Sequence, residues 1–508
     1  MFARMFLFIL SFLATSQYVV ANVPRKPDIT ITFGNLTLSL GAVDTKGNSL
    51  SLKDVQLHAD TLSMIGDSLS QKQRINNVYE YVEYPELVNS INESVNPCED
   101  FYEFVCQGWQ NKQTIEPYEN VISQFRLARD EVFLRLKKIL SEQREKDRVD
   151  DLFYIVYEKC MDKNAQNSLR SKPLLNMLRK LQDVHPEYLT DWLIEVSPVT
   201  VFVTFSVETD QMNSTRNTLE LNMVKAEMLH DYFIDEKYRD RVEAFKDYLW
   251  QIMQLLIDDD PNQEFFSKNA EAVNRSIDSF VDVETQMSLI LNESDPHADD
   301  HEAFYNLYGF DELQAVMPAI NLTKLFIAIA PKELLDKIDL KNLTVVVPEP
   351  DSLKSLDSLI QAMSASNLRN YLRWKLILAY VPFLDERFED VQLKFDTVMY
   401  GIVNKEPRWM QCVRVSINFL TDIANALYVK EYVPPNSLAD LRILMDNVRY
   451  SFENLLKENE WMDNETKGRA LLKVKELVAF IAYDEKSITK EALEKKYTLV
   501  SSISYSSE

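Results

Sequence analysis

The stretch Asn96–Gln110 reads NPCEDFYEFVCQGWQ and places two of the chain's four cysteines, Cys98 and Cys106, eight residues apart. Asn96 is a favourable N-cap and Pro97 suits the first position of a helix, and apolar side chains follow at helical spacing. A helix starting at Pro97 would separate the two Cα atoms by about 12 Å. A disulfide needs about 4.4–6.8 Å. In a continuous helix these cysteines cannot bond each other, so they face a partner surface or stay as two buried free thiols.

The N-terminus has the features of a secretory signal peptide. Residues 1–21 read MFARMFLFILSFLATSQYVVA, with an apolar run from Met5 to Ala14 and a small residue, Ala21, at the expected cleavage point. The run is shorter than a membrane-spanning helix requires. We expect cleavage after Ala21 and secretion to the extracellular space, with an uncleaved anchor as the alternative. No membrane span is expected after cleavage.

Potential N-glycosylation sites agree with an extracellular location. Eight asparagines open an N-x-S/T sequon without proline at the middle position. These are Asn35, Asn92, Asn213, Asn274, Asn292, Asn321, Asn342 and Asn464.

The composition predicts a mainly α protein with a few short strands. Hydrophobic residues make up 46% and aromatic residues 11% of the chain, which supports a large core. The net charge of −24 disfavours binding to nucleic acid and to anionic membranes. Only 8 of 508 residues are glycine, which is few for a sheet-rich protein because turns consume glycine.

Hydrophobic periodicity divides the chain into an N-terminal extension and a long helical region. Residues 22–75 contain the alternating stretch DITITFGNLTLSL, which predicts either a β-hairpin around Gly34-Asn35 or a stalk. Amphipathic helices, some of them broken in two, are predicted at Val121–Ser141, Arg148–Met161, Tyr232–Ile257, Phe266–Leu291, Ser352–Met363, Leu368–Val403, Trp409–Tyr428, Leu438–Asn459 and Glu465–Tyr483. Short strands are predicted at Thr200–Val207, Thr218–Met223 and Leu343–Val347.

Four landmarks in a fixed order resemble one enzyme family, the neprilysin-type zinc metallopeptidases, which include the endothelin-converting enzymes. The opening stretch is similar to the family's N-terminal motif, and YEKCMDKNAQ carries Cys160 as the family carries a lone cysteine on a helix. EPRWMQCV, with Cys412, looks like its W-x-x-C segment, and WMDNETKGRALLKVKEL from Trp461 resembles its W-M-D-x-x-T-K-x-x-A motif. The resemblance covers roughly Tyr79–Asp484.

The resemblance implies a large, multi-lobed helical lid domain for residues 76–508. In the family this domain encloses a cavity above a thermolysin-like catalytic domain, which brings an HExxH motif and a further glutamate as zinc ligands. The sequence ends at Glu508, before that catalytic domain would begin, so the domain is expected to be absent from it.

Histidine spacing predicts no zinc site and no catalytic residues in these 508 residues. The mechanism needs two histidines one helical turn apart with a glutamate as general base. Only His297 and His301 have the spacing, and Ala298 stands where the glutamate is required. We interpret the segment as an acidic surface. The other histidines are His58, His185 and His230.

The family resemblance also implies a bonding partner for each cysteine. The cysteines that match Cys160 and Cys412 pair with each other, so a Cys160–Cys412 disulfide is expected. The cysteines that match Cys98 and Cys106 pair with cysteines of the catalytic domain. In this chain they are expected to be unpaired or bonded to another polypeptide.

One substrate-binding residue is carried over from the family. An arginine that binds the substrate's C-terminal carboxylate is replaced by Val121, and a nearby acidic position holds Arg126. A second family arginine near that carboxylate is matched by Arg129, which is our predicted substrate-binding residue. An ordinary role for these charges on a helix surface is the alternative.

These observations predict a secreted, disulfide-bonded relative of the neprilysin-type peptidases that is not catalytic by itself. It would bind peptides or a peptidase-like protein partner. The alternative is that it forms the N-terminal portion of an active zinc endopeptidase whose catalytic domain lies outside this sequence.

Overall fold

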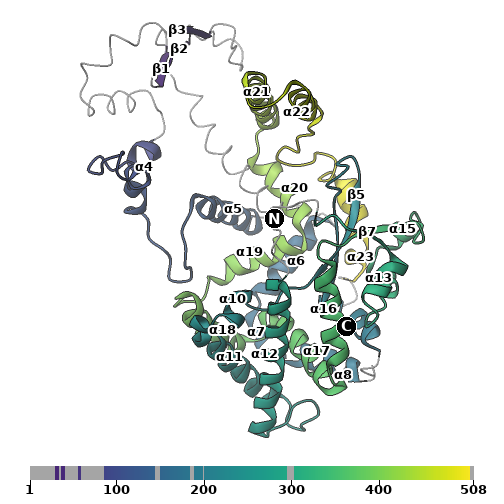
Figure 1. Ribbon diagram of the computed structural model, residues 1–508. Helices are drawn as coiled ribbons and strands as arrows, with labels where there is room; N and C mark the ends of the chain where they lie inside the picture. The colour runs from purple at the N-terminus through teal and green to yellow at the C-terminus, as the bar shows by residue number, and fades with distance from the viewer. Residues whose placement is uncertain are drawn as a thin grey trace. The chain divides into compact units, whose positions relative to one another are not determined.

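The computed structural model describes residues 29–33, 36–40, 55–58, 85–142, 149–182, 188–197, 199–293 and 303–503. Helices make up most of this part of the chain (Figure 1), as the composition predicts. The chain divides into two compact units. Unit 1 combines the residues up to Cys160 with those from Pro407 onwards, and unit 2 is Met161–Glu406. The predicted domain boundary near residue 75 falls outside the described residues.

Unit 1 consists of helices and one small antiparallel sheet. Its strands are β1 (Ile29–Phe33), β2 (Leu36–Leu40) and β3 (Val55–His58). Its helices are α3 (Pro85–Ser90), α4 (Phe101–Gln110), α5 (Gln124–Ser141), α6 (Asp150–Met161), α19 (Arg408–Phe419), α20 (Thr421–Tyr432), α21 (Ser437–Glu458), α22 (Asn464–Glu476) and α23 (Lys490–Ile503).

The small sheet includes two strands of the stretch for which the sequence predicts a hairpin or a stalk. β1 and β2 pair antiparallel, and Phe33 lies opposite Leu36. β3 pairs antiparallel with the other edge of β2.

The predicted start of the first motif helix is wrong. α4 begins at Phe101, and Asp100 is its N-cap because its side chain accepts a hydrogen bond from the Glu103 amide. Asn96 instead stabilises the preceding turn, in which its side chain accepts from the Cys98 amide at 3.0 Å. Cys98 therefore lies before the helix, and the two cysteines do not share one helical face.

The core of unit 1 lies among α5, α6, α19, α20 and α23. Its fully enclosed side chains include Val132 of α5, Phe153 of α6, Val413 of α19 and Ile423 of α20. At its edge, a guanidinium nitrogen of Arg135 donates to the Tyr428 hydroxyl at 2.9 Å. This core joins segments that lie far apart along the chain.

Unit 2 packs helices against a four-stranded mixed sheet. Its strands are β4 (Val203–Thr209), β5 (Asn217–Met223), β6 (Leu307–Gly309) and β7 (Thr344–Val346). Its helices are α7 (Lys163–Leu169), α8 (Lys172–Gln182), α9 (Leu189–Val196), α10 (His230–Ile234), α11 (Arg239–Asp259), α12 (Ala270–Glu293), α13 (Phe310–Val316), α14 (Leu322–Ile329), α15 (Lys332–Leu335), α16 (Pro350–Ala362), α17 (Ala365–Tyr380) and α18 (Glu386–Tyr400), with single 3-10 turns at Glu236–Tyr238 and Val381–Phe383.

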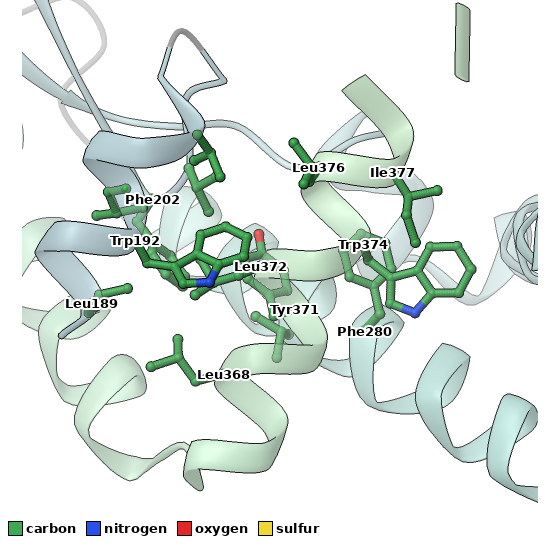
Figure 2. Packing of buried hydrophobic residues seen from close by; sticks show 14 of the residues in the cluster. Leu189, Trp192, Phe202, Phe280, Leu368, Tyr371, Leu372, Trp374, Leu376 and Ile377 are labelled. Carbon is green, nitrogen blue, oxygen red and sulfur yellow. The ribbon is translucent and has the colours of Figure 1, made fainter. Parts of the chain in front are cut away.

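The sheet of unit 2 has the order β4-β5-β7-β6. β4 and β5 pair antiparallel, β5 and β7 pair parallel, and β6 pairs antiparallel with β7. The core of unit 2 is rich in aromatic side chains (Figure 2). The Tyr371 ring of α17 stacks on the Phe202 ring with centroids 5.1 Å apart, and its centroid lies 5.4 Å from that of Phe280. This packing joins α17 to α12 and to the residue before β4.

Several predicted helices are divided into two or end earlier in the structure. The predicted helix Leu368–Val403 is α17 and α18, separated by a 3-10 turn that contains Pro382. Trp409–Tyr428 is α19 and α20, with the break at Leu420. The last predicted helix ends at Glu476 instead of Tyr483. Among the described residues, no helix is long and apolar enough to cross a membrane.

Gly108 allows α4 to approach the end of α3. A Cβ atom at this position would lie 2.6 Å from the Asn89 carbonyl oxygen and 2.8 Å from the Ser90 carbonyl. Because these are backbone atoms, we expect Gly108→Ala to destabilise the α3–α4 pair by about 1–3 kcal/mol. Gly468, inside α22, has no atom within 4 Å of such a Cβ.

Gly468→Ala is therefore the matched control. It should stabilise unit 1 by about 0.5–1 kcal/mol because alanine restricts the unfolded chain and favours helix. Chemical denaturation of both variants measures the difference. Equal effects of the same sign would contradict the close approach of α3 and α4.

Candidate functional site

The histidines provide no metal centre in the part of the chain that the structure describes. His230 begins α10 and is half exposed, and its Nε2 lies 2.7 Å from Oδ1 of Asp231. No three His, Cys, Asp or Glu side chains among the described residues form a group that could hold a metal. These residues therefore do not fit the three-ligand set of a catalytic zinc. The side chains of the other histidines lie outside the described part: His58, His185, His297 and His301.

The predicted substrate-binding arginine lies in an ion-pair cluster at the start of α5. Ser123 caps this helix by accepting from the Arg126 amide. Arg129 contacts Glu119 at 3.3 Å and Asp130 at 2.9 Å. Arg126 pairs with the same two carboxylates. Two guanidinium groups and two carboxylates balance in charge.

Burial shows which of these arginines is structural. The Arg126 side chain is only 8% exposed, and it also donates to the Val121 carbonyl oxygen at 3.2 Å. Arg129 is 36% exposed and lies over the Phe133 ring. The Val121 side chain is exposed. Because both arginines are already paired, the cluster favours a structural role over recognition of a substrate carboxylate.

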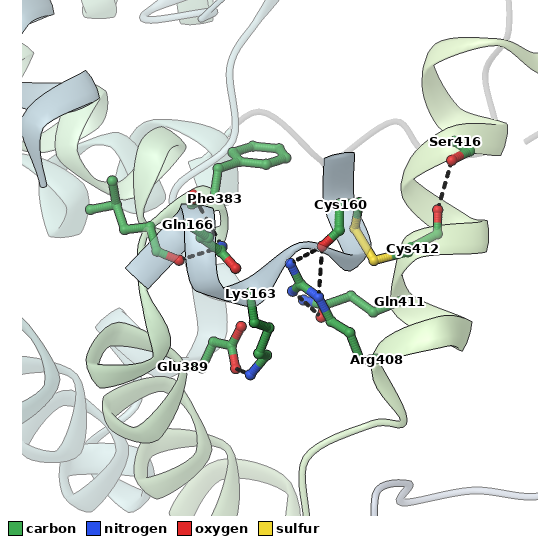
Figure 3. Close-up of a disulfide and its surroundings, with 10 residues drawn as sticks. Cys160, Lys163, Gln166, Phe383, Glu389, Arg408, Gln411, Cys412 and Ser416 are labelled. Atoms are coloured by element: carbon green, nitrogen blue, oxygen red, sulfur yellow. Dashed lines mark hydrogen bonds and ion pairs between the residues drawn. A yellow bond between two sulfur atoms is a disulfide. The ribbon is translucent and has the colours of Figure 1, made fainter. Parts of the chain in front are cut away.

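A disulfide joins α6 to α19, as the family resemblance implies (Figure 3). The sulfur atoms of Cys160 and Cys412 are 2.06 Å apart, and the bond spans 252 positions of sequence. Arg408 supports it, because its Nε donates to the Cys160 carbonyl oxygen at 3.0 Å. In the next turn of α19 the Ser416 hydroxyl donates to the Cys412 carbonyl oxygen.

Cys98 and Cys106 are free thiols in this structure. Cys98 is exposed, in the turn before α4, and Cys106 is half buried within α4. Asn92 forms two hydrogen bonds with α4. Its side-chain amide donates to the side-chain oxygen of Gln107, and its backbone N–H donates to the Phe104 carbonyl oxygen at 2.8 Å. The hydrogen bonds of Asn92 thus fix the segment that carries both thiols.

A buried charged cluster in unit 2 is absent from our sequence predictions. Lys375 of α17 is 5% exposed; it pairs with Glu227 and lies 3.7 Å from Glu284 of α12. Glu284 is fully buried and accepts from the Tyr371 hydroxyl at 2.8 Å and from the Glu227 amide at 2.5 Å. Two carboxylates share one ammonium group, so the cluster carries an excess negative charge when every member is ionised.

Burial changes the pKa values of Glu284 and Tyr371. Burial raises the pKa of Glu284, and the neighbouring charge of Glu227 raises it further, although Lys375 acts in the opposite direction. Burial likewise raises the pKa of Tyr371, and the Glu284 charge adds to that effect. A raised carboxyl pKa means that the folded state favours the neutral form of Glu284.

A second cluster of charges surrounds an open pocket of about 410 Å³ between α7 and α18. Asp259 is buried and accepts from Arg387 at 2.7 Å, while Arg170 lies 2.7 Å away. Burial alone would raise the pKa of Asp259, but hydrogen bonds from Arg387 and Ser171 outweigh burial and lower it. These groups hold α7 to the start of α18, and their pairing leaves little charge for a ligand.

Most of the predicted glycosylation sites that the structure describes are accessible. Asn92 is half buried. The side chains of Asn35 and Asn292 lie outside the described part. The exposed sequon asparagines are Asn213, Asn274, Asn321, Asn342 and Asn464.

Comparison with known proteins identifies the family. The sequence model of Peptidase family M13 matches residues 97–484. The chain belongs to this family. The match begins at Pro97, inside the opening motif, and ends at Asp484, so it spans both units and confirms the resemblance read from the sequence.

Curated relatives of the chain are peptidases by name. Neprilysin-11 of Caenorhabditis elegans is 27% identical over 429 residues, which are 81% of this chain and 50% of that protein. Human membrane metallo-endopeptidase-like 1 is 27% identical over 409 residues, or 76% and 51% of the two chains. The chain thus spans about half the length of the curated relatives it matches.

Solved structures share the fold. The Mycobacterium tuberculosis zinc metalloprotease ZMP1 aligns with a TM-score of 0.65 and 18% identity, over 82% of this chain and 63% of that one. PepO of Lactobacillus rhamnosis aligns with a TM-score of 0.62 and 14% identity, over 80% and 64%. At these identities the likeness concerns the fold alone.

Removing Arg126 should cost more stability than removing Arg129. Arg126→Ala removes the more buried of the two guanidinium groups from two partly buried carboxylates, so we expect a loss of about 3 kcal/mol. Arg129→Ala removes a more exposed pair and should cost about 1 kcal/mol or less. Urea denaturation of both variants tests the order. If Arg129→Ala were the more costly change, the structural assignment of the cluster would be wrong.

The buried Glu284 predicts a specific pH dependence. A carboxyl group whose pKa is raised on folding contributes stability that is complete below its unfolded pKa, about 4.3, and is lost as pH rises through the folded pKa. Glu284→Gln keeps a hydrogen-bond acceptor for Tyr371 and removes this loss. Thermal unfolding between about pH 4 and pH 8 should therefore show a flatter profile for the variant.

Glu271→Gln is the control for that comparison, because Glu271 lies on the same helix, α12, and its side chain is 84% exposed. It should leave the pH profile of the wild type unchanged. A Glu284→Gln profile parallel to the wild type would show that the charge of Glu284 does not limit stability.

Proposed function

We propose that the chain is the N-terminal, lid-forming half of a secreted neprilysin-type metalloendopeptidase and does not cleave peptides by itself. A zinc-containing catalytic half, on the same or another polypeptide, would complete the enzyme. The observation that carries this proposal is the number and spacing of the histidines. The 508 residues contain five histidines, and the one pair at HxxxH spacing has Ala298 where the catalytic glutamate is required.

The extent of the family match supports the same proposal. The relatives are about twice as long as the region they share with this chain. A chain that supplies the family's helical half without its ligand set can position and select peptides, but it lacks the group that activates water. Zinc, when bound by the catalytic half, would supply that activation.

The two free thiols support a covalent link to the catalytic half. Cys98 is exposed and Cys106 half buried, and neither has a cysteine partner among the described residues. In an oxidising compartment, free cysteines beside an intact structural disulfide favour bonding to cysteines elsewhere. The family resemblance assigns their partners to the catalytic domain.

Secretion is part of the proposal. The signal-like segment at residues 1–21, the exposed sequon asparagines and the Cys160–Cys412 disulfide all suit an extracellular protein. The alternative function, a self-standing binder of peptides, receives less support. Arg129, its predicted contact with a substrate carboxylate, is already paired with Glu119 and Asp130.

The intact mass of the native secreted protein tests the proposal. After enzymatic removal of glycans and without reduction, we expect a mass larger than residues 22–508 by a catalytic half, whether fused or disulfide-linked. Cys98 and Cys106 should resist iodoacetamide in that material. They should react in purified residues 22–508, which should bind no stoichiometric zinc.

A native mass equal to residues 22–508, with both thiols reactive, would contradict the proposal and leave a self-standing binding protein. Stoichiometric zinc together with peptide cleavage by residues 22–508 alone would also contradict it, because the described residues form no suitable ligand group.

A further inference from the structure

The four-stranded sheet of unit 2 has two edges that differ in length. The strand order β4-β5-β7-β6 places β4 at one edge and β6 at the other. β6 has three residues, so it offers little backbone for pairing with a further strand. β4 has seven residues and pairs with β5 on one side. Its other side meets no strand of the described chain, so one long edge of the sheet is left unpaired.

The sequence of β4 lacks the usual protections of an edge strand. It reads VTFSVET, with apolar side chains in alternation, one carboxylate, and neither lysine nor proline. Val207 lies opposite Leu219, so both side chains point to the same face of the sheet, yet Leu219 is 7% exposed and Val207 is 61% exposed. A weakly charged strand of this length and composition readily pairs with a strand of another chain.

The connection between β4 and β5, residues 210–216, carries a glycosylation sequon. Asn213 opens it and is exposed. Its side-chain oxygen accepts from the Thr215 hydroxyl at 2.6 Å and from the Thr215 amide at 3.2 Å. Its side-chain nitrogen, the atom to which an N-linked glycan attaches, has no hydrogen-bond partner in the described part of the chain. The nitrogen is therefore available for a glycan without loss of a contact.

Hydrogen bonds to one buried carboxylate hold this connection in place. Asp210, which directly follows β4, is 1% exposed and accepts from Arg216 at 2.8 Å and from the Tyr305 hydroxyl at 3.0 Å. It also accepts from the amides of Met212 and Asn213, at 2.9 Å and 3.0 Å. A glycan on Asn213 would thus project from a fixed point close to the exposed end of β4.

The other sequons of the described chain lie elsewhere. The side-chain nitrogen of Asn92 donates to Gln107, and that of Asn342 donates to Asp339 at 2.7 Å. Asn274 lies within α12 and is exposed, and Asn464 begins α22. Among the described residues, Asn213 is thus the sequon asparagine placed between β4 and its partner strand.

We propose that an N-linked glycan on Asn213 covers the outer edge of β4 and prevents this strand from pairing with β4 of a second copy. The inference rests on secretion, which is part of the proposed function. A glycan is bulky and solubilising. The exposed end of β4, Val207–Thr209, spans about 10 Å, which is less than the length of several linked sugars. Paired strands lie about 4.8 Å apart, so sugars beside this edge exclude a second strand.

The test expresses the full 508-residue chain in animal cells and collects the secreted protein. Mass spectrometry of its glycopeptides gives the occupancy of each sequon, and sedimentation velocity gives the strength of self-association. Asn213→Gln and Thr215→Ala both remove the sequon but change different contacts of the connection, so the glycan is their shared loss. Asn274→Gln, which removes an exposed sequon from α12, is the control. We expect both sequon variants to self-associate at least tenfold more strongly than the wild type and the control.

Val207→Lys provides a rescue that links the effect to β4. Lysine on an edge strand opposes pairing between strands, and the exposed position of Val207 accepts it without loss of core packing. Val207→Lys in the Asn213→Gln background should restore the sedimentation of the wild type. A variant that associates because it is misfolded would not be rescued in this way.

The other outcomes separate the two proposals. If other sequons carry glycans and Asn213 does not, this inference is overturned while the proposed function stands. If Asn213 is occupied but its loss leaves self-association unchanged, or Val207→Lys fails to reverse the association, the glycan does not shield β4 and the inference is again overturned. If the protein stays inside the cell without any glycan, secretion fails and this inference fails with it.

Discussion

The Cys160–Cys412 disulfide is the constraint on which unit 1 depends. Unit 1 is discontinuous: the chain leaves it after Cys160, builds all of unit 2, and returns at Pro407. The bond ties the last residue before departure to the first helix after return, α19. Closing a loop of 252 residues corresponds to about 5 kcal/mol of chain entropy. That is comparable to the whole stability of many domains. Without the bond, α19 and α20 would be held to α5 and α6 only by apolar packing and a few hydrogen bonds, such as that from Arg135 to Tyr428.

The sequence predicted those features that depend on neighbouring residues. The mainly helical class and the positions of the long helices follow from period and composition. The predicted start of a helix was wrong where one side chain could cap either the helix or the turn before it. Asn96 can cap a helix or a turn, and in this structure it caps the turn while Asp100 caps α4. The strand Leu307–Gly309 was missed because three residues carry no readable alternation, and it exists only by pairing with β7.

The polar clusters show more clearly what a local sequence pattern cannot predict. Lys375 lies in RNYLRWKLIL, where a lysine reads as a solvent-facing residue of a helix, yet it is 5% exposed. Its partners, Glu227 and Glu284, are separated from it by 148 and 91 positions, so no local pattern could reveal the cluster. The arginines at the start of α5 were visible as charges, but their pairing with Glu119 was not. Family resemblance could suggest a role for Arg129; only the geometry shows that its charge is already balanced.

Buried charges and exposed apolar side chains differ in whether the fold provides them with partners. Buried charged groups described above have partners within their own unit: Arg126 with Glu119, Asp259 with Arg387, and Lys375 with Glu227. The cost of burying these charges is therefore offset internally. α21 is different, because Leu444, Phe452 and Leu455 stay in water although their spacing suits a buried helix. A partner recognised through this surface would gain affinity by removing apolar area from water, a contribution that salt screens little. α21 and α22 thus leave large apolar side chains in water, as do several other segments of the described chain. A contact made through these helices would therefore depend on apolar burial more than on steering by charge.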